Sequence, residues 1–319
     1  MAGALNAALR DTLSRDERTL VFGEDVGALG GIFGVTTGLQ KEFGRERVFN
    51  TPSAEAGITG VSIGLALAGW RPIAEMQFDG FSYPALDQAI CHVAKYRNRT
   101  RGRAPVPMVI RIPFGGGLRG KEHHAESPET YYAHTPGLKV VAPSNASDAY
   151  RMLVQAVADP DPVVFLEPKS RYKVAEEFDA SDDGYSLARA RTVREGNSCT
   201  VVTYGAMVAR SIEAADSLVV EGIEAEVLDL RSLSPLDTEA IGASVRLTGR
   251  AVVVHEAPRT LGIGAEVSAR IMEEAFDFLE APVARVTGYD TPYPPATLED
   301  RWYPSAERIA SAIRTVVGY

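Results

Sequence analysis

The chain has 319 residues, of which 45% are hydrophobic and 24% are charged, and its formal net charge is −9. This length allows one large or two ordinary domains, and the acidic balance argues against nucleic acid or a membrane as a partner. The two cysteines, Cys91 and Cys199, lie far apart without metal-type spacing, as is typical of reduced thiols. Residues 1–18 form a charged amphipathic helix rather than a signal peptide, and no apolar run approaches the roughly 20 residues that span a bilayer. We therefore expect a soluble, cytoplasmic protein.

In the first half of the chain, short apolar stretches alternate with helical patterns. The stretches expected to contain strands are RTLVFGEDVG (18–27), TGLQKEFGRERVFNTP (37–52, after a short helix), RPIAEMQF (71–78), VPMVIRIPF (106–114) and PVVFLEP (162–168). Helical periodicity marks residues 54–69, 83–100 and 148–160. Strands separated by helices pair in parallel, so the pattern predicts an α/β sheet covered on both faces.

Residues 169–195 have a different character, charged and poor in large apolar groups, as expected of a connector between domains. The alternation then resumes. Strands are expected at 199–205, 224–230, 251–257 and 281–288, and helices at 207–222, 237–249 and 264–278. We predict two α/β domains, residues 1–185 and 186–319.

The stretch NTPSAEAGITG (50–60) contains a single carboxylate, Glu55, among small and apolar neighbours. Ser53 is a candidate cap for the helix that starts here. A capping box would place Glu or Gln three residues after the cap, and that position is Ala56. Capping therefore leaves Glu55 unexplained on a helix that otherwise has a buried pattern.

Three short motifs suggest other chemistries, but their contexts argue against them. GVSIG (60–64) matches the nucleophile elbow of hydrolases but lies inside a helical pattern, where its glycines fit close helix packing better. LGIGAEV (261–267) has Val267 where the third glycine of a dinucleotide loop should stand. GALGGIFG (27–34) lacks the Lys-Ser/Thr ending of a P-loop.

KEHHAESPE (121–129) places two adjacent histidines, His123 and His124, after the glycine run FGGGLRG. Adjacent histidines in regular structure usually cannot point at one metal ion. A flexible surface loop with solvated histidines and a catalytic or substrate-binding imidazole both fit the spacing.

Motifs along nearly the whole chain resemble the β subunit of thiamine-diphosphate-dependent 2-oxo acid dehydrogenases, the E1 component of the branched-chain and pyruvate complexes. In order, they are VFGEDVG, VFNTPSAEAGITGVSIGLALAGWRPIAEMQF, YPALDQ, AKYRNRT, IRIPFGGG, HAESPE, PGLKVVAPSNASDA, PVVFLEPK, YGAMV and EVLDLRSLSPLD. HAESPETYYAHTPGLKVV and FLEPKSRY look closer to the branched-chain enzymes. The resemblance implies a transketolase-like fold, in which a pyrimidine-binding domain precedes a transketolase C-terminal domain that serves dimerisation and docking.

The resemblance also implies roles for individual residues. Glu55 corresponds to the glutamate that hydrogen-bonds N1′ of the cofactor's pyrimidine ring, a role for which burial should raise its pKa. Phe81 matches the aromatic residue that packs on that ring, although branched-chain relatives commonly carry Tyr there. Gln77 and the backbone around Ser53 match further pocket positions. His124 aligns with the active-site histidine that assists substrate and lipoyl-group chemistry.

Two further expectations concern metal ions. In QAVADPDPVV, the carbonyl of Ala156 and the groups of Asp159 and Asp161 match a structural potassium site, although Asn is usual at the last position. The G-D-G motif that binds the diphosphate through Mg²⁺ is missing, because FDG (78–80) and DDG (182–184) do not fit it. The missing half of the site should belong to an α subunit that holds Mg²⁺, which gives an α2β2 heterotetramer.

The sequence therefore predicts the E1 β subunit of a branched-chain 2-oxo acid dehydrogenase. With its α partner it would decarboxylate 3-methyl-2-oxobutanoate and related acids and pass the acyl group to the lipoyl group of the E2 acyltransferase. The alternatives are a pyruvate or acetoin dehydrogenase E1 β subunit and a non-catalytic transketolase-like scaffold. E2 is expected to contact the C-terminal domain between residue 289 and the end of the chain.

Overall fold

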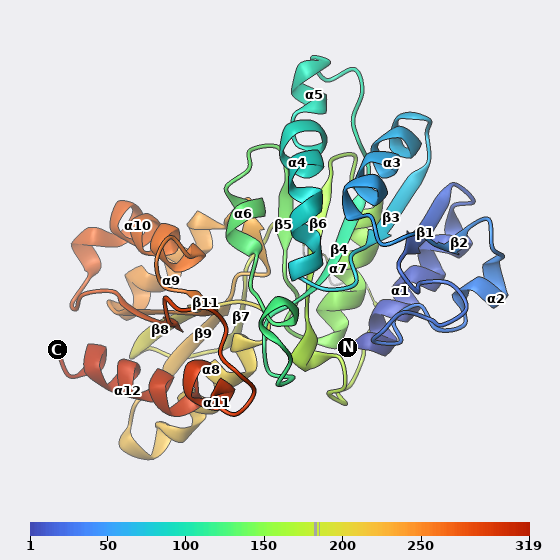
Figure 1. The fold of residues 1–319 in the computed structure, drawn as a ribbon. Helices are drawn as coiled ribbons and strands as arrows, with labels where there is room; N and C mark the ends of the chain where they lie inside the picture. The colour runs from blue at the N-terminus through green and yellow to red at the C-terminus, as the bar shows by residue number, and fades with distance from the viewer. Residues whose placement is uncertain (182–183, 185) are drawn as a thin grey trace. The chain divides into compact units, whose positions relative to one another are not determined.

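A computed structural model describes residues 1–181, 184 and 186–319, which form two compact units. The first comprises Met1–Phe114 and Tyr131–Leu187, and the second comprises Gly115–Thr130 and Ala188–Tyr319 (Figure 1). Residues 115–130 thus group with the second unit, although the predicted division assigned them to the first domain. The predicted boundary at residue 185 lies outside the described residues.

The first unit is built on a parallel sheet with the strand order β5-β6-β4-β3-β1-β2 (Figure 1). The strands are β1 (Thr19–Gly23), β2 (Val48–Asn50), β3 (Arg71–Glu75), β4 (Val109–Phe114), β5 (Lys139–Val141) and β6 (Val163–Pro168). β1, β4 and β6 are buried along their full length, which explains their continuous apolar sequences. The predicted parallel α/β sheet is confirmed.

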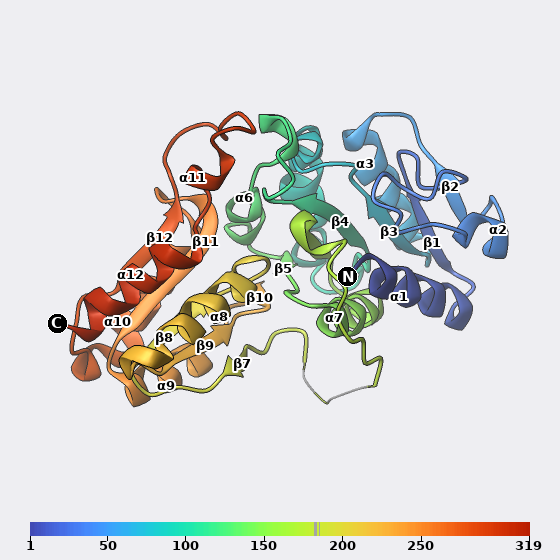
Figure 2. The same cartoon turned by 90° about the horizontal axis from the view of Figure 1, so that it is seen from below.

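Helices cover both faces of this sheet. Figure 2 shows α1 (Ala2–Arg15) beside α7 (Ala146–Ala158) on one face and α3 (Glu55–Leu67) on the other. α1 buries Leu5, Leu9 and Leu13, spaced four residues apart on one helix face. The remaining short helical elements of the chain's first half are α2 (Leu39–Phe43), η1 (Gly80–Ala85), α4 (Leu86–Gln88), the π-helix η2 (Ala89–Val93), α5 (Tyr96–Arg99), η3 (Glu122–His124), α6 (Glu129–Ala133) and η4 (Lys169–Arg171).

The second unit contains a mixed sheet with the order β12-β11-β8-β9-β7. Its strands are β7 (Arg191–Arg194), β8 (Cys199–Thr203), β9 (Ala225–Asp229), β11 (Ala251–Pro258) and β12 (Ala284–Gly288), and the short β10 (Ser232–Ser234) follows β9. β7 pairs antiparallel with β9, whereas the other pairs are parallel. The four strands expected in this half are therefore present, and β7 is an addition from within the stretch expected to be a connector.

Helices α8 (Met207–Ser217) and α12 (Ala306–Val317) pack together on one face of this sheet, and α9 (Thr238–Thr248) and α10 (Ile263–Ala275) pack together on the other (Figure 1). The shorter elements are η5 (Val219–Glu221), η6 (Phe276–Phe278) and α11 (Glu299–Trp302). α12 buries Ile309, Ile313 and Val316 in the core of the unit. The last helix is thus a structural part of this unit.

The connector prediction also fails at its start, where two polar residues lie in the core of the first unit. Lys169 is fully buried, and its ammonium group donates to Asp79 at 2.6 Å. The hydroxyl of Tyr172 donates to Glu167 at 2.6 Å. In the part of the chain that the structure describes, no helix has the length and apolar character required to cross a membrane.

Candidate active site

Polar side chains follow three neighbouring strands of the first unit where each strand ends. β1 pairs in parallel with both β2 and β3, so the carboxyl ends of the three strands meet at one edge of the sheet. Ligands of open α/β sheets bind beyond this edge. The residues placed there are Glu24 and Asp25 after β1, Ser53 and Glu55 after β2, and Gln77 after β3.

Glu55 and Glu24 form a pair of carboxyl groups at this edge. Glu55 is the first residue of α3, and only 8% of it is exposed. Burial raises the pKa of Glu24, a hydrogen bond with Glu55 and the charge of Glu55 raise it further, and a hydrogen bond with Ser53 opposes these effects. Two carboxyl groups this close hold a proton between them more readily than two separate ones. The pair is therefore suited to proton exchange with a ligand.

One oxygen atom of this pair makes no hydrogen bond in the described structure. Oε1 of Glu24 is buried and has no hydrogen-bond partner among the described residues. A buried polar atom without a partner costs free energy, which a bound polar group would recover.

Ser53 does not cap α3, contrary to the sequence prediction. The N-cap position is Ala54, whose side chain has no polar atom to accept a hydrogen bond. Ser53 lies near Glu24 instead, where it lowers the pKa of that carboxyl. Ser53 thus lies beside the carboxyl pair.

Gln77 is fixed from the neighbouring strand end. Its Nε2 donates to Oδ2 of Asp25 at 2.9 Å, and Asp25 has a left-handed backbone with φ 58°. Such a conformation costs free energy in a residue other than glycine and is common at functional sites. Sequence reasoning missed Asp25, although it stands beside Glu24 in the acidic end of the first strand.

Aromatic rings extend from this edge of the sheet. The half-buried Phe81 lies edge-on to Phe78, with ring centroids 5.7 Å apart, and Phe78 lies edge-on to Phe33 at 5.5 Å. Edge-to-face contacts at these distances are favourable and hold the rings in place. The site thus combines a carboxyl pair with an apolar aromatic surface.

His124 lies in the second unit, whereas Glu24, Ser53, Glu55 and Gln77 lie in the first. It ends the short helix η3, and its ring packs against that of His123, with centroids 4.2 Å apart and ring planes at 66°. The two imidazole rings thus pack edge to face.

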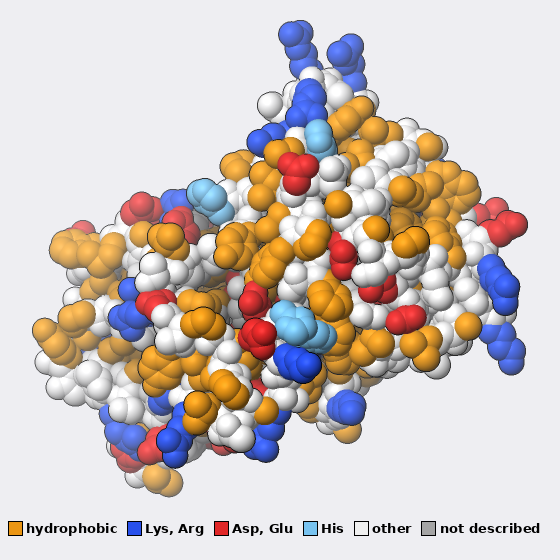
Figure 3. All heavy atoms as spheres, in the orientation of Figure 1, with side chains coloured by type: hydrophobic (Ala, Val, Ile, Leu, Met, Phe, Trp, Pro, Cys, Tyr) orange, Lys and Arg blue, Asp and Glu red, His pale blue; other side chains and the backbone are white. Residues whose placement is uncertain are grey.

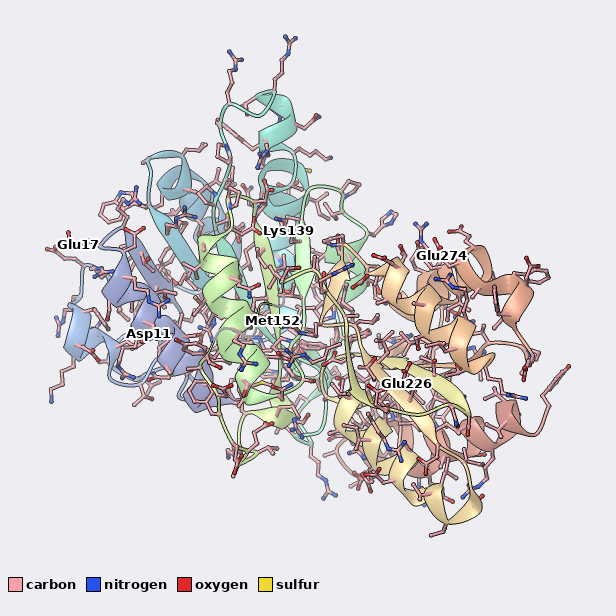
Figure 4. The ribbon with its side chains drawn as sticks, turned by 180° about the vertical axis from the view of Figure 1, so that it is seen from behind. Asp11, Glu17, Lys139, Met152, Glu226 and Glu274 are labelled. Carbon is pink, nitrogen blue, oxygen red and sulfur yellow. The ribbon has the colours of Figure 1, made fainter. Side chains whose placement is uncertain are left out.

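The carboxylates expected to bind potassium are paired with cationic side chains. Nζ of Lys139, the first residue of β5, lies 2.7 and 2.6 Å from the two carboxylate oxygens of Asp159. Arg97 donates to Asp161 at 2.5 Å. Figure 4 labels Lys139 and, on the helix that precedes Asp159, Met152.

The carbonyl groups at the end of α7 are engaged as well. Nη1 of Arg71 donates to the carbonyl oxygens of Val157 and Asp159 at 3.1 and 3.2 Å. A potassium ion needs several oxygen ligands, and here an ammonium and a guanidinium group already contact the carboxylates of Asp159 and Asp161. Potassium would have to compete with these cations at Asp159 and Asp161, and the ligand set of Ala156, Asp159 and Asp161 stays a prediction.

No group of three or more His, Cys, Asp or Glu side chains within residues 1–181, 184 and 186–319 is arranged to hold a metal ion. In FDG (78–80), the aspartate is Asp79, which is buried and paired with Lys169. The other string, DDG (182–184), falls largely outside the described residues. Sequence reasoning missed the Asp79–Lys169 pair because ninety residues separate its members.

Comparisons with known proteins place both units in known families. Residues 1–174 match the transketolase pyrimidine-binding domain, and residues 188–309 match the transketolase C-terminal domain. A 3-methyl-2-oxobutanoate dehydrogenase subunit beta from Mycobacterium tuberculosis (strain ATCC 25618 / H37Rv) is 51% identical, over 99% of this chain and 91% of that protein.

Pyruvate dehydrogenase E1 component subunits beta are similar to nearly the same degree. That of Leifsonia xyli subsp. xyli is 50% identical over 100% of this chain and 95% of its own length, and that of Bacillus subtilis (strain 168) is 48% identical over 100% and 98%. Among solved structures, a split gene transketolase in an inactive beta4 tetramer has a TM-score of 0.83 at 25% identity, over 99% of this chain and 97% of that chain. The predicted transketolase-like fold is confirmed.

Because Asp159 and Asp161 are already paired with cationic side chains, we expect that potassium does not stabilise this protein specifically. The midpoint of thermal unfolding in KCl should lie within about 1 °C of that in choline chloride at equal ionic strength. Such a shift corresponds to a difference in the free energy of unfolding of well under about 1 kcal/mol. Lys139→Met should lower the midpoint slightly in both salts, because it removes the cation beside Asp159, a partly exposed ion pair worth about 0.2–1 kcal/mol. Lys41→Met, at an exposed position of α2, is the matched control. A clearly higher midpoint of the unmodified chain in KCl than in choline chloride would support a specific potassium site.

Proposed function

Because the chain belongs to the family of E1 β subunits of 2-oxo acid dehydrogenases, we propose that it supplies the pyrimidine-binding half of a thiamine diphosphate site shared with an α subunit. The assembled α2β2 enzyme decarboxylates 3-methyl-2-oxobutanoate and related acids and transfers the acyl group to the lipoyl group of E2. The observation that carries the proposal is the buried Glu55, paired with Glu24 at the carboxyl edge of the sheet.

The residues at this edge fit the aminopyrimidine of thiamine diphosphate. Glu55 donates or accepts a proton at a ring nitrogen, the partner-free Oε1 of Glu24 offers an acceptor, and the half-buried Phe81 offers an apolar ring surface. Ser53 and Gln77 complete the polar rim. When bound, the cofactor supplies the electron sink that decarboxylation of a 2-oxo acid requires.

Glu55 acts in this scheme as the acid-base group. Its closeness to Glu24, whose pKa is raised by burial and by Glu55, favours sharing of a proton at the site, as acid-base work on the cofactor requires. His124 acts later and assists transfer of the acyl group to the lipoyl group. Two roles in one reaction are thus divided between the two units of the chain.

The need for a partner subunit is supported by an exposed apolar helix face. On α3, which begins with Glu55, Val61 and Leu67 are 58% and 40% exposed, and Trp70 just beyond it is 37% exposed. Figure 3 shows hydrophobic side chains gathered over this helix. Gly64 has no neighbour within 4 Å of an added Cβ in the described structure, so the close packing expected from its sequence is not made within this chain. A contiguous apolar patch of this kind marks an interaction surface.

Docking of E2 is assigned to exposed residues of the second unit rather than to its last helix. α12 contributes to the core, so removing it would unfold the unit. Tyr289 and Leu298, which precede it, are 49% and 46% exposed. These side chains are available to a partner without any change in the fold.

The branched-chain substrate is proposed over pyruvate from the stretches HAESPETYYAHTPGLKVV and FLEPKSRY. Relatives of both kinds share about half of their residues with this chain, so overall identity does not separate the two substrates.

Glu55→Gln in the assembled enzyme tests the acid-base role of this residue. The shape of the side chain is nearly kept, but the amide cannot exchange a proton, so hydrogen–deuterium exchange at C2 of the bound cofactor should slow by roughly 10²–10⁴. Folding, assembly and cofactor binding should change little, because one neutral hydrogen bond contributes only about 0.5–1.5 kcal/mol. Glu46→Gln, at an exposed position, is the matched control. If C2 of the cofactor exchanged at the unmodified rate in Glu55→Gln, Glu55 would be only a carboxylate at a helix end, without an acid-base role.

The proposed substrate preference can be measured on the assembled enzyme. The enzyme purified after co-expression with its α chain should show a kcat/KM at least about tenfold higher for 3-methyl-2-oxobutanoate than for pyruvate, because a pocket that fits a branched side chain loses apolar contacts with a methyl group. Initial decarboxylation rates with an artificial electron acceptor measure this ratio. A preference for pyruvate would select the pyruvate dehydrogenase alternative, and no turnover of any 2-oxo acid would select the scaffold.

A further inference from the structure

Two buried carboxylates of the second unit bind the backbone of the glycine run that precedes His124. Glu256, in β11, is 3% exposed, and its Oε2 accepts a hydrogen bond from the N–H of Gly116 at 2.7 Å. Glu299, the first residue of α11, is 2% exposed, and its Oε1 accepts from the N–H of Gly117. Buried carboxylates are costly unless they are hydrogen-bonded, so each bond anchors the loop firmly.

Glycine is required at these positions because the carboxylates and a tyrosine stand where a side chain would be. A Cβ on Gly115 would lie 2.5 and 2.6 Å from the two carboxylate oxygens of Glu256, and Gly115 has a φ of +79°. A Cβ on Gly116 would lie 1.9 Å from the hydroxyl oxygen of Tyr293. The glycine run thus allows close approach of the backbone to buried groups. The sequence expectation of a flexible loop does not account for these contacts.

The segment from Gly115 to Thr130 is closed on itself and anchored at both ends. The N–H of Gly115 donates to the carbonyl of Glu126 at 2.8 Å, which closes the loop two residues beyond His124. At the far end, the buried Glu129 accepts from the hydroxyl of Tyr204 at 2.6 Å. His124 therefore lies inside a loop whose fixed points all belong to the second unit.

We infer that Glu256 and Glu299 are positioning residues that set the place of His124 through the backbone of Gly116 and Gly117. The inference rests on the proposed role of His124 in acyl transfer. Neither carboxylate needs to contact substrate or cofactor, because each acts through the loop. Neutralising either one weakens a charge-assisted hydrogen bond and loosens the loop without touching the carboxyl pair of the first unit.

The test uses Glu256→Gln and Glu299→Gln in the assembled enzyme, with Glu213→Gln at an exposed position of α8 as the control. C2 exchange of the bound cofactor should stay within about twofold of the unmodified rate. Reductive acylation of the lipoyl domain should fall roughly ten- to a hundredfold, the scale expected when a reacting group is displaced by about 1 Å. Amide hydrogen exchange of Gly116 and Gly117 should accelerate in the chain without cofactor, while the unfolding midpoint stays near its unmodified value.

A double variant separates positioning from general destabilisation. If Glu256 acts through His124, Glu256→Gln combined with His124→Ala should acylate no more slowly than His124→Ala alone, because the two changes remove one function. Multiplied losses in the double variant, or normal acylation despite fast amide exchange at Gly116, would overturn the inference. If Glu256→Gln fails to fold, Glu299→Gln combined with His124→Ala is compared with His124→Ala in the same way, and the same outcomes apply. Normal acylation in His124→Ala, by contrast, would overturn the proposed role of His124 itself, whereas loss of C2 exchange in that variant would count against the proposed division of roles.

Discussion

The first unit depends on a buried guanidinium held between two carboxylates. Arg111 of β4 is fully buried and donates to Glu75 of β3 at 2.6 Å and to Glu167 of β6 at 2.6 and 2.9 Å, so one side chain ties three neighbouring strands. Removing a member of such a buried group leaves an uncompensated charge, at a typical cost of 3–5 kcal/mol. Glu75 pairs directly with Gly23, the residue before Glu24. The strand ends that carry the candidate site are therefore held in register by this group.

The two units use buried carboxylates in different ways. At the edge of the first sheet, Glu24 and Glu55 stand close enough for burial and mutual charge to raise the pKa of Glu24, which suits proton exchange. In the second unit, Glu256 accepts a hydrogen bond from the backbone N–H of Gly116 and so holds that part of the loop. Its charge, after the larger effect of burial, raises the pKa of Tyr303, which stays neutral. The same residue type thus has a raised pKa at one place and accepts a backbone hydrogen bond at the other, because its surroundings differ.

The sequence predicted those parts of the fold that local patterns determine. Continuous apolar runs such as VVFLEP gave the parallel strands correctly, because burial on both faces leaves a local signature. Lys169 was assigned to a connector because its neighbours are charged, while the Asp79 that neutralises it lies ninety residues away. The cationic partners at the predicted potassium ligands were missed for the same reason, since Lys139 and Arg71 reach Asp159 and the end of α7 from other strands. Ser53 was predicted to cap the helix because its nearness to Glu24, which follows a different strand, leaves no local signal in the sequence.

The central claim is that this chain holds half of a thiamine diphosphate site and is completed by an α subunit. Titration calorimetry of thiamine diphosphate with Mg²⁺ tests it most directly, on the isolated chain and on the co-purified α/β pair. The account predicts negligible heat of binding for the isolated chain and tight binding to the pair that disappears when Mg²⁺ is chelated. Micromolar binding to the isolated chain would contradict the account.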